Sequence, residues 1–323
     1  MVFILAAAIS ASAFAPIGPA LAQGWPSKPV RIVVAYPPGG GIDVMARQIA
    51  DRLTPAWGQP VVVENKPGAN TIVATDAVAK SAPDGYTVLM TTDATFSINP
   101  HLYAKLPFDP QRDFIPVTML VLLQQLLVAH PSLPANTLEE LVKLAKAKPG
   151  TINYASYGSG SQPHLAGEML KNKAGIDLVH IPYKGISLAV PAVMAGEVQL
   201  TFAGIATSSA PLKSGRIKAL AIGGAQRSPL FPQVPTFTEL GFPEVETHAW
   251  FGLFLPAGSP REAVARIYHD TKRILDDPQF RQKQLIDRGY EVLGSSPEEF
   301  SVYMKSDSAS RARAVKISGA KAE

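Results

Sequence analysis

Apolar residues follow two kinds of pattern along this chain, one typical of strands and one typical of helices. Residues 30–36 form a β-branched apolar run, which predicts a buried strand. The next stretch predicts a helix, because its apolar residues recur at spacings of three and four, namely Ile42, Met45, Ile49 and Leu53. Residues 84–92 predict a turn followed by a strand, and further strands are predicted at 61–64, 151–156, 177–183, 198–204 and 217–223. Further helices are predicted at 71–82, 137–149, 161–175 and 187–197. Strands separated by helices of this length indicate parallel sheets with right-handed crossovers, so we expect an α/β fold with two doubly wound units.

Three short motifs mark helix starts. Residues 137–140, 259–262 and 296–299 each place Ser or Thr three residues before Glu, which is the pattern of a capping box. The last two motifs also place Pro at the expected first helical position. Helices therefore dominate after residue 258, and we expect the end of the chain to pack back across one domain.

The first 23 residues are apolar and uncharged, and residues 20–22 (Ala-Leu-Ala) fit a small-x-small cleavage site. We expect residues 1–22 to be a signal peptide for secretion to the periplasm, although a positively charged start is missing. A membrane anchor is the alternative, but prolines and a glycine at 16–19 break the run short of the ~20 apolar residues that a span needs. The apolar run 116–130 is interrupted by Gln124 and Gln125.

Composition narrows the possible partners. The chain is 46% hydrophobic and 17% charged, which suits a packed globular protein. The net charge of +4 is spread along the chain without a Lys/Arg block, so we expect a mildly cationic surface and no nucleic-acid partner. There is no cysteine, which excludes disulfides, thiolate metal sites and a cysteine nucleophile.

The stretch VVAYPPGGGIDVMARQIADRL, residues 33–53, runs from a strand through a glycine turn into a helix. Helix N-termini present unpaired N–H groups and about half a positive charge, so such a turn lets a carboxylate or phosphate approach. A phosphate loop would need Gly-Lys-Ser/Thr after the glycines, and a dinucleotide fingerprint would need glycine where Val44 stands. Asp43 is placed to cap the helix, where it would compete with an anion. A tight turn without a ligand is the alternative.

A second glycine turn, at residues 154–170, strengthens the anion hypothesis. Its small and polar residues before the helix are Ser156, Gly158, Gly160 and Ser161, the last being the expected N-cap. Tyr183 and Gly185 precede another predicted helix. Two such turns in two α/β units could hold a small anion from both sides of a cleft.

No pattern for catalysis or metal binding stands out. The chain contains neither a G-x-S-x-G elbow nor an H-E-x-x-H motif. His164 and Glu168 lie four residues apart, but one such pair is more often a surface hydrogen bond than a metal site. We expect no enzymatic activity, no metal and no cofactor.

Several motifs occur in one order along the chain: YPPGGGIDVMARQIADRL, VVVENKPGAN, DAVAKSAPDGYTVLM, INPHLYAKLPFDPQRDFIPVTML, GTINYASYGSGSQPHLAGEMLK, PYKG and LAIGGAQRSPLFPQVPTFTELG. Together, over about residues 25–300, they resemble the solute-binding proteins of tripartite tricarboxylate transporters, the Bug receptors. The resemblance implies a monomeric periplasmic binding protein of the flytrap type, similar to type II, that delivers an organic carboxylate to membrane permease subunits. Residues 23–122 with 248–323 would form domain 1, and residues 123–247 domain 2.

The same resemblance implies a set of ligand-binding residues. The first loop contributes Tyr36, Pro38, Gly39, Gly40 and Asp43, and the end of the third strand contributes Thr92, Asp93 and Ser97. The second glycine turn contributes Ser156, Gly158, Gly160, Ser161 and His164, and the next loop contributes Tyr183 and Gly185. Their implied role is hydrogen bonding to carboxylate oxygens, with Tyr36 covering the ligand.

Three departures from the family pattern affect these expectations. One is YKGISLAVPAV, which replaces the family's small-residue and Pro pattern after YKG and so bears on the shape of the pocket there. Many relatives carry an Asp after VQLTF, where this chain has Ala203 and Gly204, which argues against an ammonium group on the ligand and favours di-, tri- or aromatic acids. The last helix lacks the family's usual Glu and Trp, which we expect to affect C-terminal packing more than ligand choice. Two other functions stay open: a binding protein that feeds a sensor, and a secreted α/β enzyme acting on an organic acid.

Overall fold

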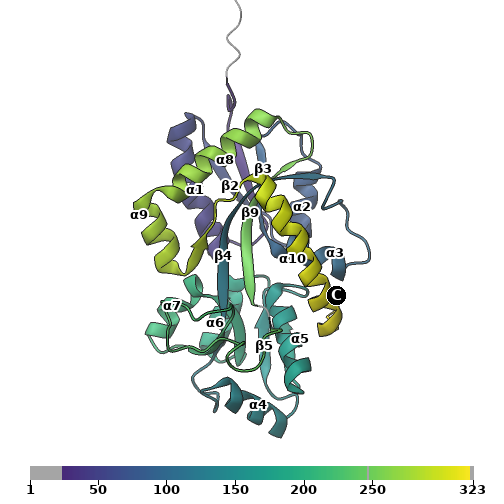
Figure 1. Cartoon of the computed structure of the whole chain (residues 1–323), viewed down its shortest axis with the longest axis vertical. Coiled ribbons are helices and arrows are strands. Elements are labelled where there is room, and N and C mark those ends of the chain that lie inside the picture. Colours follow the sequence, from purple (N-terminus) through teal and green to yellow (C-terminus); the bar gives the residue numbers. More distant parts are fainter. Residues whose placement is uncertain (1–23, 246, 321–323) are drawn as a thin grey trace, which may run out of the picture.

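The computed structural model describes residues 24–245 and 247–320, which fold into two α/β lobes, one above the other in Figure 1. The predicted signal peptide, residues 1–22, lies outside the described residues. Within 24–245 and 247–320, no helix combines the length and the apolar character that a membrane span requires.

The first lobe is organised around β1 (Val30–Val34), which pairs in parallel with both β2 (Val61–Asn65) and β3 (Thr87–Thr92). The crossover elements are α1 (Gly41–Trp57) and α2 (Ile72–Ala79), and β3 leads into the π-helical turn η1 (Ala94–Ile98) and α3 (Asn99–Leu102). The end of the chain returns to this lobe as α8 (Arg261–Asp276), α9 (Pro278–Phe280), η2 (Arg281–Leu285), η3 (Ile286–Arg288), β10 (Tyr290–Val292) and α10 (Pro297–Ser318).

The second lobe repeats this plan. Its central strand β5 (Asn153–Ser156) pairs in parallel with β6 (Val179–Pro182) and β7 (Leu200–Gly204). The helices are α4 (Leu138–Ala147), α5 (Gln162–Ala174), α6 (Ile186–Ala195) and α7 (Ile205–Lys213), and the last strand is β8 (Lys218–Ile222). The predicted α/β class with two doubly wound units is confirmed in these parallel strands.

Two long strands, β4 (Phe114–Ala129) and β9 (His248–Pro256), connect the lobes and run antiparallel to each other. β4 pairs with β9 up to Gln124 and with β7 from Gln125 onward, and it also pairs with β8 and β10. All four pairings are antiparallel, so the sheets are mixed, and the expectation of parallel sheets alone is wrong. The reason is topological: the chain enters the second lobe along β4 and returns along β9, in the opposite direction.

The predicted domain boundaries fall close to this crossing. The boundary between residues 122 and 123 lies within β4, two residues before its pairing passes from β9 to β7. The boundary between residues 247 and 248 coincides with the start of β9. The division into domains stays a prediction.

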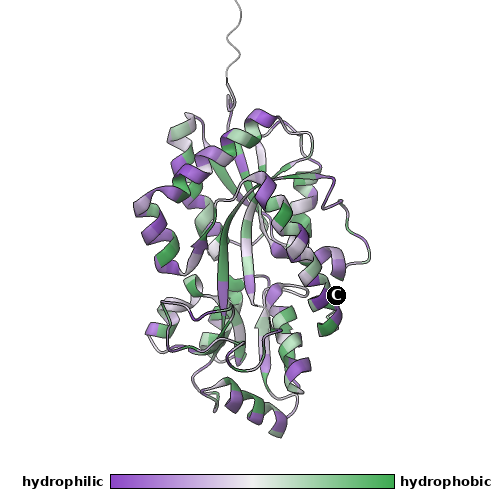
Figure 2. Ribbon diagram, viewed as in Figure 1, coloured by the Kyte–Doolittle hydropathy of each residue, from purple (hydrophilic) through white to green (hydrophobic). Residues whose placement is uncertain are grey.

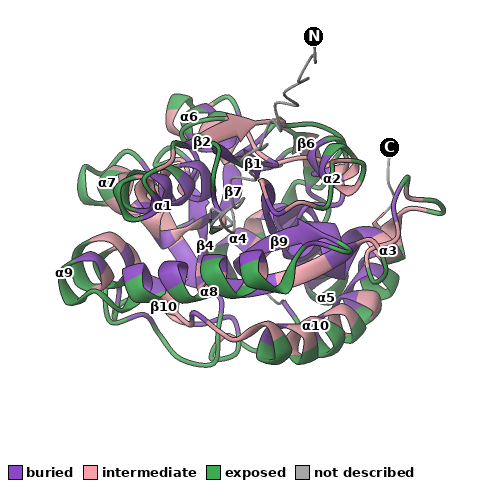
Figure 3. Ribbon diagram, turned by 90° about the horizontal axis from the view of Figure 1, so that it is seen from above, coloured by how far each residue is buried: buried purple, intermediate pink, exposed green. Residues whose placement is uncertain are grey.

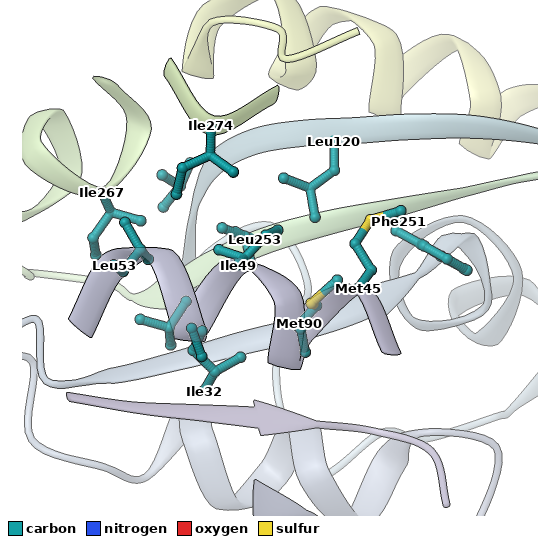
Figure 4. Close-up of a cluster of buried hydrophobic side chains, with 14 of the residues drawn as sticks. Ile32, Met45, Ile49, Leu53, Met90, Leu120, Phe251, Leu253, Ile267 and Ile274 are labelled. Atoms are coloured by element: carbon teal, nitrogen blue, oxygen red, sulfur yellow. The ribbon is translucent and has the colours of Figure 1, made fainter. Parts of the chain in front are cut away.

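The largest core of the first lobe lies between α1, the sheet and α8. The helix face predicted from apolar spacing is buried: Ile42, Met45, Ile49 and Leu53 are each at most 4% exposed. Figure 4 shows Met45, Ile49 and Leu53 packed against side chains of β3, β4, β9 and α8. In Figure 2 hydrophobic residues run along β4 while hydrophilic ones mark the outer faces of α4 and α8, and Figure 3 shows α8 turning an exposed face outward.

The three predicted capping boxes have different outcomes. At Ser296 both hydrogen bonds of the box form, with Pro297 as the first helical residue. At Thr137 the hydroxyl accepts from the Glu140 N–H, but the Glu140 carboxylate accepts from Asn136 N–H instead of the N-cap amide. The box at Ser259 is wrong, because α8 begins one residue later, with Pro260 at the N-cap and no side-chain cap.

The final helix, α10, contacts both lobes. It packs on β4, η1 and α3, and also on α5 of the second lobe. Its 22 residues span roughly 33 Å at 1.5 Å per residue, which is long enough to reach across the junction. The end of the chain thus packs back on the first lobe, and α10 in addition reaches the second lobe through α5.

Candidate functional site

A cavity of about 700 Å³, part of it open to solvent, lies between the lobes. The first lobe lines it with the ends of β1 and β3, the start of α1, and β9 and β10, while the second lobe contributes the loop after β5 and the starts of α5, α6 and α7. Because β4 lines the cavity at Leu123 and Gln125, the long connecting strand forms its floor.

Four helices direct their N-termini at this cavity: α1, α5, α6 and α7. None has a side-chain hydrogen bond from its N-cap residue, and these residues are Gly40, Ser161, Gly185 and Gly204. Of the helices that start away from the cavity, α4 and α10 are capped by Thr137 and Ser296, whereas α2 and α8 also lack a side-chain cap. The amides of a first helical turn have no partner within the helix and carry partial positive charge, so four uncapped N-termini form an environment for an anion.

The first glycine turn brings Tyr36 and Gly40 to the cavity. The Tyr36 hydroxyl and the Thr92 hydroxyl are 2.9 Å apart, and burial raises the pKa of Tyr36 well above its usual value, so the phenol stays protonated. A Cβ on Gly40 would lie 3.2 Å from Ile186 Cγ2, and one on Gly41 would lie 2.5 Å from the Tyr290 hydroxyl. Glycine at position 40 therefore lets α1 lie close to the opposite lobe, and glycine at position 41 leaves room for Tyr290 of its own lobe.

Asp43 and its neighbours support this turn from outside the cavity lining. The Asp43 carboxylate accepts hydrogen bonds from Gly39 N–H, Arg47 and Asn65. Burial alone would raise the pKa of Asp43, but these hydrogen bonds outweigh burial and lower it. Gly39 adopts a φ of +86° and borders an adjoining groove, while Pro38 is exposed. The predicted competition between Asp43 and an anion is relieved, because Asp43 binds the amide of Gly39, which precedes the helix.

Of the three residues predicted after β3, Thr92 and Asp93 line the cavity. The Asp93 side chain is 2% exposed, and its Oδ2 lies 3.5 Å from a guanidinium nitrogen of Arg311 on α10. Burial raises the pKa of Asp93 to about 6, with the charge of Asp307 adding to the effect and Arg311 and His248 opposing it. Ser97 is fully buried in η1 and lies outside the lining.

The predicted residues of the second glycine turn shape the loop, while its neighbours Tyr157 and Gln162 reach the cavity. The Ser156 hydroxyl is 2.7 Å from His180 Nε2, and Ser161 donates to the Gly158 carbonyl. Gly160 N–H donates to His164 Nδ1, and His164 stacks on His180 with ring centroids 4.0 Å apart. Burial and the neighbouring His164 lower the pKa of His180 to about 3. Ser161 is the N-cap as predicted, but its hydroxyl does not cap the helix.

The third predicted loop lies against the first one across the cavity. Gly185 has a φ of +134°, and a Cβ there would lie 3.0 Å from Pro37 Cδ, so only glycine fits this approach. Tyr183 is partly buried next to this turn, and the lining residues are instead Ile186 and Ser187. Of the predicted site residues, the structure thus brings Tyr36, Gly40, Thr92 and Asp93 to the cavity lining.

Comparison with known proteins places the chain in a family. The family model described as tripartite tricarboxylate transporter family receptor matches residues 45–319. The chain belongs to this receptor family. Among its relatives, Protein BugT of Bordetella pertussis is 34% identical over 297 residues, covering 92% of this chain and 87% of BugT.

Two of the similar solved structures are described together with a ligand. Rpa4515 of R. palustris, with adipate, has a TM-score of 0.88 at 32% identity and covers 92% of this chain and 99% of its own. MatC (Rpa3494) from Rhodopseudomonas palustris, with bound malate, has a TM-score of 0.85 at 30% identity and covers 90% of this chain and all of its own. The receptor family and these structural relatives agree with the two-lobe α/β fold.

Several cavity residues of this receptor were not predicted from its sequence: Gln125, Tyr157, Gln162, Thr207, Phe251 and Tyr290. Gln125 had a visible signal, since two glutamines interrupt an otherwise apolar run at 116–130. Tyr157 and Gln162 stand directly beside predicted residues. Phe251 and Tyr290 lie in apolar or mixed strands that carry no local mark of a site, so their role emerges only from the fold.

The departures from the family pattern have structural consequences at the cavity. Gly204, where many relatives carry an Asp nearby, is the N-cap of α7 and lines the cavity with bare backbone. The lining does contain a carboxylate, but it comes from β3, as Asp93. The last helix reaches the same place, because its buried Arg311 lies 3.5 Å from Asp93. In the described part of the chain, no three His, Asp or Glu side chains group as metal ligands.

Proposed function

We propose that this protein captures a small organic carboxylate between its two lobes in the periplasm and delivers it to the membrane subunits of a tripartite transporter. The observation that carries the proposal is the meeting of four uncapped helix N-termini around one cavity. No Lys or Arg of the described part of the chain lines this cavity, so the backbone amides would supply the positive potential for the ligand's carboxylate.

The rest of the lining indicates the kind of carboxylate. Apolar side chains from both lobes surround the cavity, including Ile42, Leu123, Ile186 and Phe251. Such a lining suits a ligand with a hydrocarbon chain or ring between its polar ends. We therefore propose a di-, tri- or aromatic carboxylic acid, a class to which the adipate and malate of the structural relatives also belong.

Binding without turnover is part of the proposal. Among residues 24–245 and 247–320, Asp93 is the only Asp or Glu in the lining, and no histidine lines the cavity beside it. A hydrolytic site would need a nucleophile with a base within hydrogen-bond reach. Residues 1–22, as a signal peptide, would direct the protein to the periplasm.

The proposal is tested by calorimetry and thermal shift on residues 23–323 after unfolding and refolding to remove any co-purified ligand. The panel contains succinate, adipate, citrate and benzoate, each with its neutral amide as a matched control. A ligand at ~100 times its dissociation constant should stabilise the protein by about 2.7 kcal/mol, and the amides should not. Binding of an acid and its amide with equal affinity, or of none of the acids, would refute a carboxylate receptor.

Transport is tested separately in cells. Deletion of the gene should abolish uptake of the acid that binds, and a plasmid copy should restore it. A receptor that binds tightly while its deletion leaves uptake unchanged would indicate a sensor partner instead. Release of a chemically altered acid from the purified protein would indicate an enzyme.

A further inference from the structure

A second hollow, which we call the mouth groove, adjoins the cavity. It has a volume of about 900 Å³, part of it open to solvent, and lies between α1 and the η2–β10 segment of the first lobe and α6 and α7 of the second. The cavity and the mouth groove share six lining residues: Gly41, Ile186, Ser187, Ala206, Thr207 and Tyr290. Because of this shared boundary, the mouth groove is a route from solvent to the cavity.

One side chain supplies the charge of the mouth groove. Within the described part of the chain, Arg288 is the only charged residue in its lining. Arg288 is partly buried at the end of η3, and no described carboxylate forms an ion pair with it. The neighbouring Asp287 instead accepts a hydrogen bond from Gln282. Asp43 lies outside the groove lining and pairs with Arg47. The positive charge of Arg288 is therefore not neutralised by a contact within the fold.

Backbone packing places Arg288 where the two lobes meet. The next residue, Gly289, has a φ of +77°, and a Cβ there would lie 2.5 Å from Ile205 Cγ2, so only glycine fits. Ile205 is the first residue of α7, whose N-cap Gly204 has no side-chain cap. Burial raises the pKa of Tyr290 to about 12, and the charge of Arg288 opposes that rise. Arg288 thus lies between an uncapped helix start of the second lobe and a tyrosine of the cavity lining.

The Arg288 guanidinium and the nearby helix starts have charge of the same sign. The N-termini of α1, α6 and α7 border the mouth groove and carry partial positive charge. No Asp or Glu of the described chain lines the groove to offset these charges. The fold therefore gains little from a cation at this position, whereas an anion that enters the groove is attracted by Arg288 and by the helix starts together.

We propose that Arg288 captures the anionic ligand in the mouth groove and thereby speeds its entry into the cavity. This inference rests on the proposed function, since the helix starts inside the cavity must finally hold the acid. It adds the entry route and the residue that serves it. The low-dielectric walls of a groove focus the field of a charge and raise the local concentration of an oppositely charged ligand. The attraction acts over a distance, so dissolved salt should screen it.

The experiment compares binding to the refolded protein at ionic strengths of about 0.02 M and about 0.5 M. The probes are succinate, adipate, citrate and benzoate. Calorimetry gives their dissociation constants, and tryptophan fluorescence in stopped flow gives the association rates. At low ionic strength, Arg288→Gln should slow association and weaken binding by about threefold or more for a dianion and about twofold for benzoate, because Coulomb attraction over ~10 Å scales with ligand charge. At high ionic strength, the variant and the wild type should agree within about 1.5-fold.

Three further variants separate charge from structure. Arg288→Lys keeps the charge and should bind as wild type. Arg288→Glu reverses the charge and should weaken binding of a dianion by about tenfold at low ionic strength, and it serves if Arg288→Gln does not fold. Lys283→Gln is the matched control, because Lys283 is an exposed cation on the preceding η2 turn and lies outside the groove lining. It should bind with nearly wild-type affinity.

The possible outcomes distinguish this inference from the proposed function. Weaker binding in Arg288→Gln at low ionic strength that disappears at high ionic strength and is rescued in Arg288→Lys supports the inference. If Arg288→Gln binds as Lys283→Gln does, or is weakened equally at both ionic strengths, the inference is wrong while the carboxylate receptor stands. If the wild type binds none of the four acids, the proposed function and this inference are both wrong.

Discussion

Replacing Asp93 by Asn should stabilise the ligand-free protein at neutral pH. Burial raises the pKa of Asp93 from 3.8 to about 6, because the carboxylate loses its hydration and Arg311 compensates for only part of that loss. An acid with a raised pKa in the folded state destabilises folding above that pKa and not below its unfolded value. The stability of the wild type should therefore fall as pH rises from about 4 to 6, and Asn cannot titrate.

The magnitude follows from the difference between the two pKa values. About two units at 1.36 kcal/mol per unit give about 3 kcal/mol at pH 8, and the same relation gives roughly half of that at pH 5. Urea unfolding of wild type and Asp93→Asn at both pH values measures this difference directly. Several degrees of melting temperature should separate the two proteins at pH 8.

Asp51→Asn is the control, since this exposed acid should change stability by no more than about 0.5 kcal/mol at either pH. Two results would refute the reasoning. If Asp93→Asn is less stable than the wild type, Asp93 is a required partner of Arg311. If its advantage is the same at pH 5 and pH 8, its charge is not what destabilises the fold.

Three further outcomes are expected. Gly40→Val should weaken binding of any ligand acid at least tenfold in calorimetry, because its side chain meets Ile186 across the cavity, and unchanged affinity in a folded variant would contradict this. Ser296→Ala should cost about 1 kcal/mol in urea unfolding because it removes a cap, whereas Ser259→Ala should cost much less; equal losses would mean that both serines cap. The lowered pKa of His180 means that the unfolded protein binds a proton more readily, so stability should fall as pH drops below 6.5. His180→Gln should reduce this fall. Identical profiles of unfolding free energy against pH in the two proteins would exclude His180 as its source.

Local sequence patterns predicted much of the secondary structure correctly. The apolar spacing of α1 identified its buried face, and the Ser296 box identified the start of α10. Both signals depend on residues within one or two helical turns, so they keep their meaning whatever the rest of the chain does. The same kind of signal was wrong at Ser259, where the chain around Pro260 extends one residue further before the helix begins.

The pairing of the long strands was harder to predict. An apolar run such as 114–129 indicates burial but does not specify its direction in a sheet. Whether β4 and β9 run parallel or antiparallel depends on where the chain enters and leaves the second lobe. Both points depend on the fold of the more than one hundred residues between the two strands.

The cavity, too, has some features that the sequence indicates and others that only the packing decides. The glycine turns at 38–41 and 158–160 were visible in the sequence, because glycine next to a helix start has a local meaning. That Tyr157 and Gln162, and not Ser156 or His164, reach the lining depends on side-chain directions that the packing of α5 decides. The contact between Asp93 and Arg311 joins residues more than two hundred positions apart, and no local pattern encodes it.

By itself, then, the amino-acid order determined the elements, their buried faces and the glycine-rich helix starts that suit an anion. Only the tertiary structure decided that four of those helix starts surround one cavity, and that a buried carboxylate with its arginine lies behind it. The physical reason is range: helix periodicity and capping act over a few residues. Burial of charge and the meeting of helix ends depend on contacts that exist only after both lobes have packed against β4 and β9.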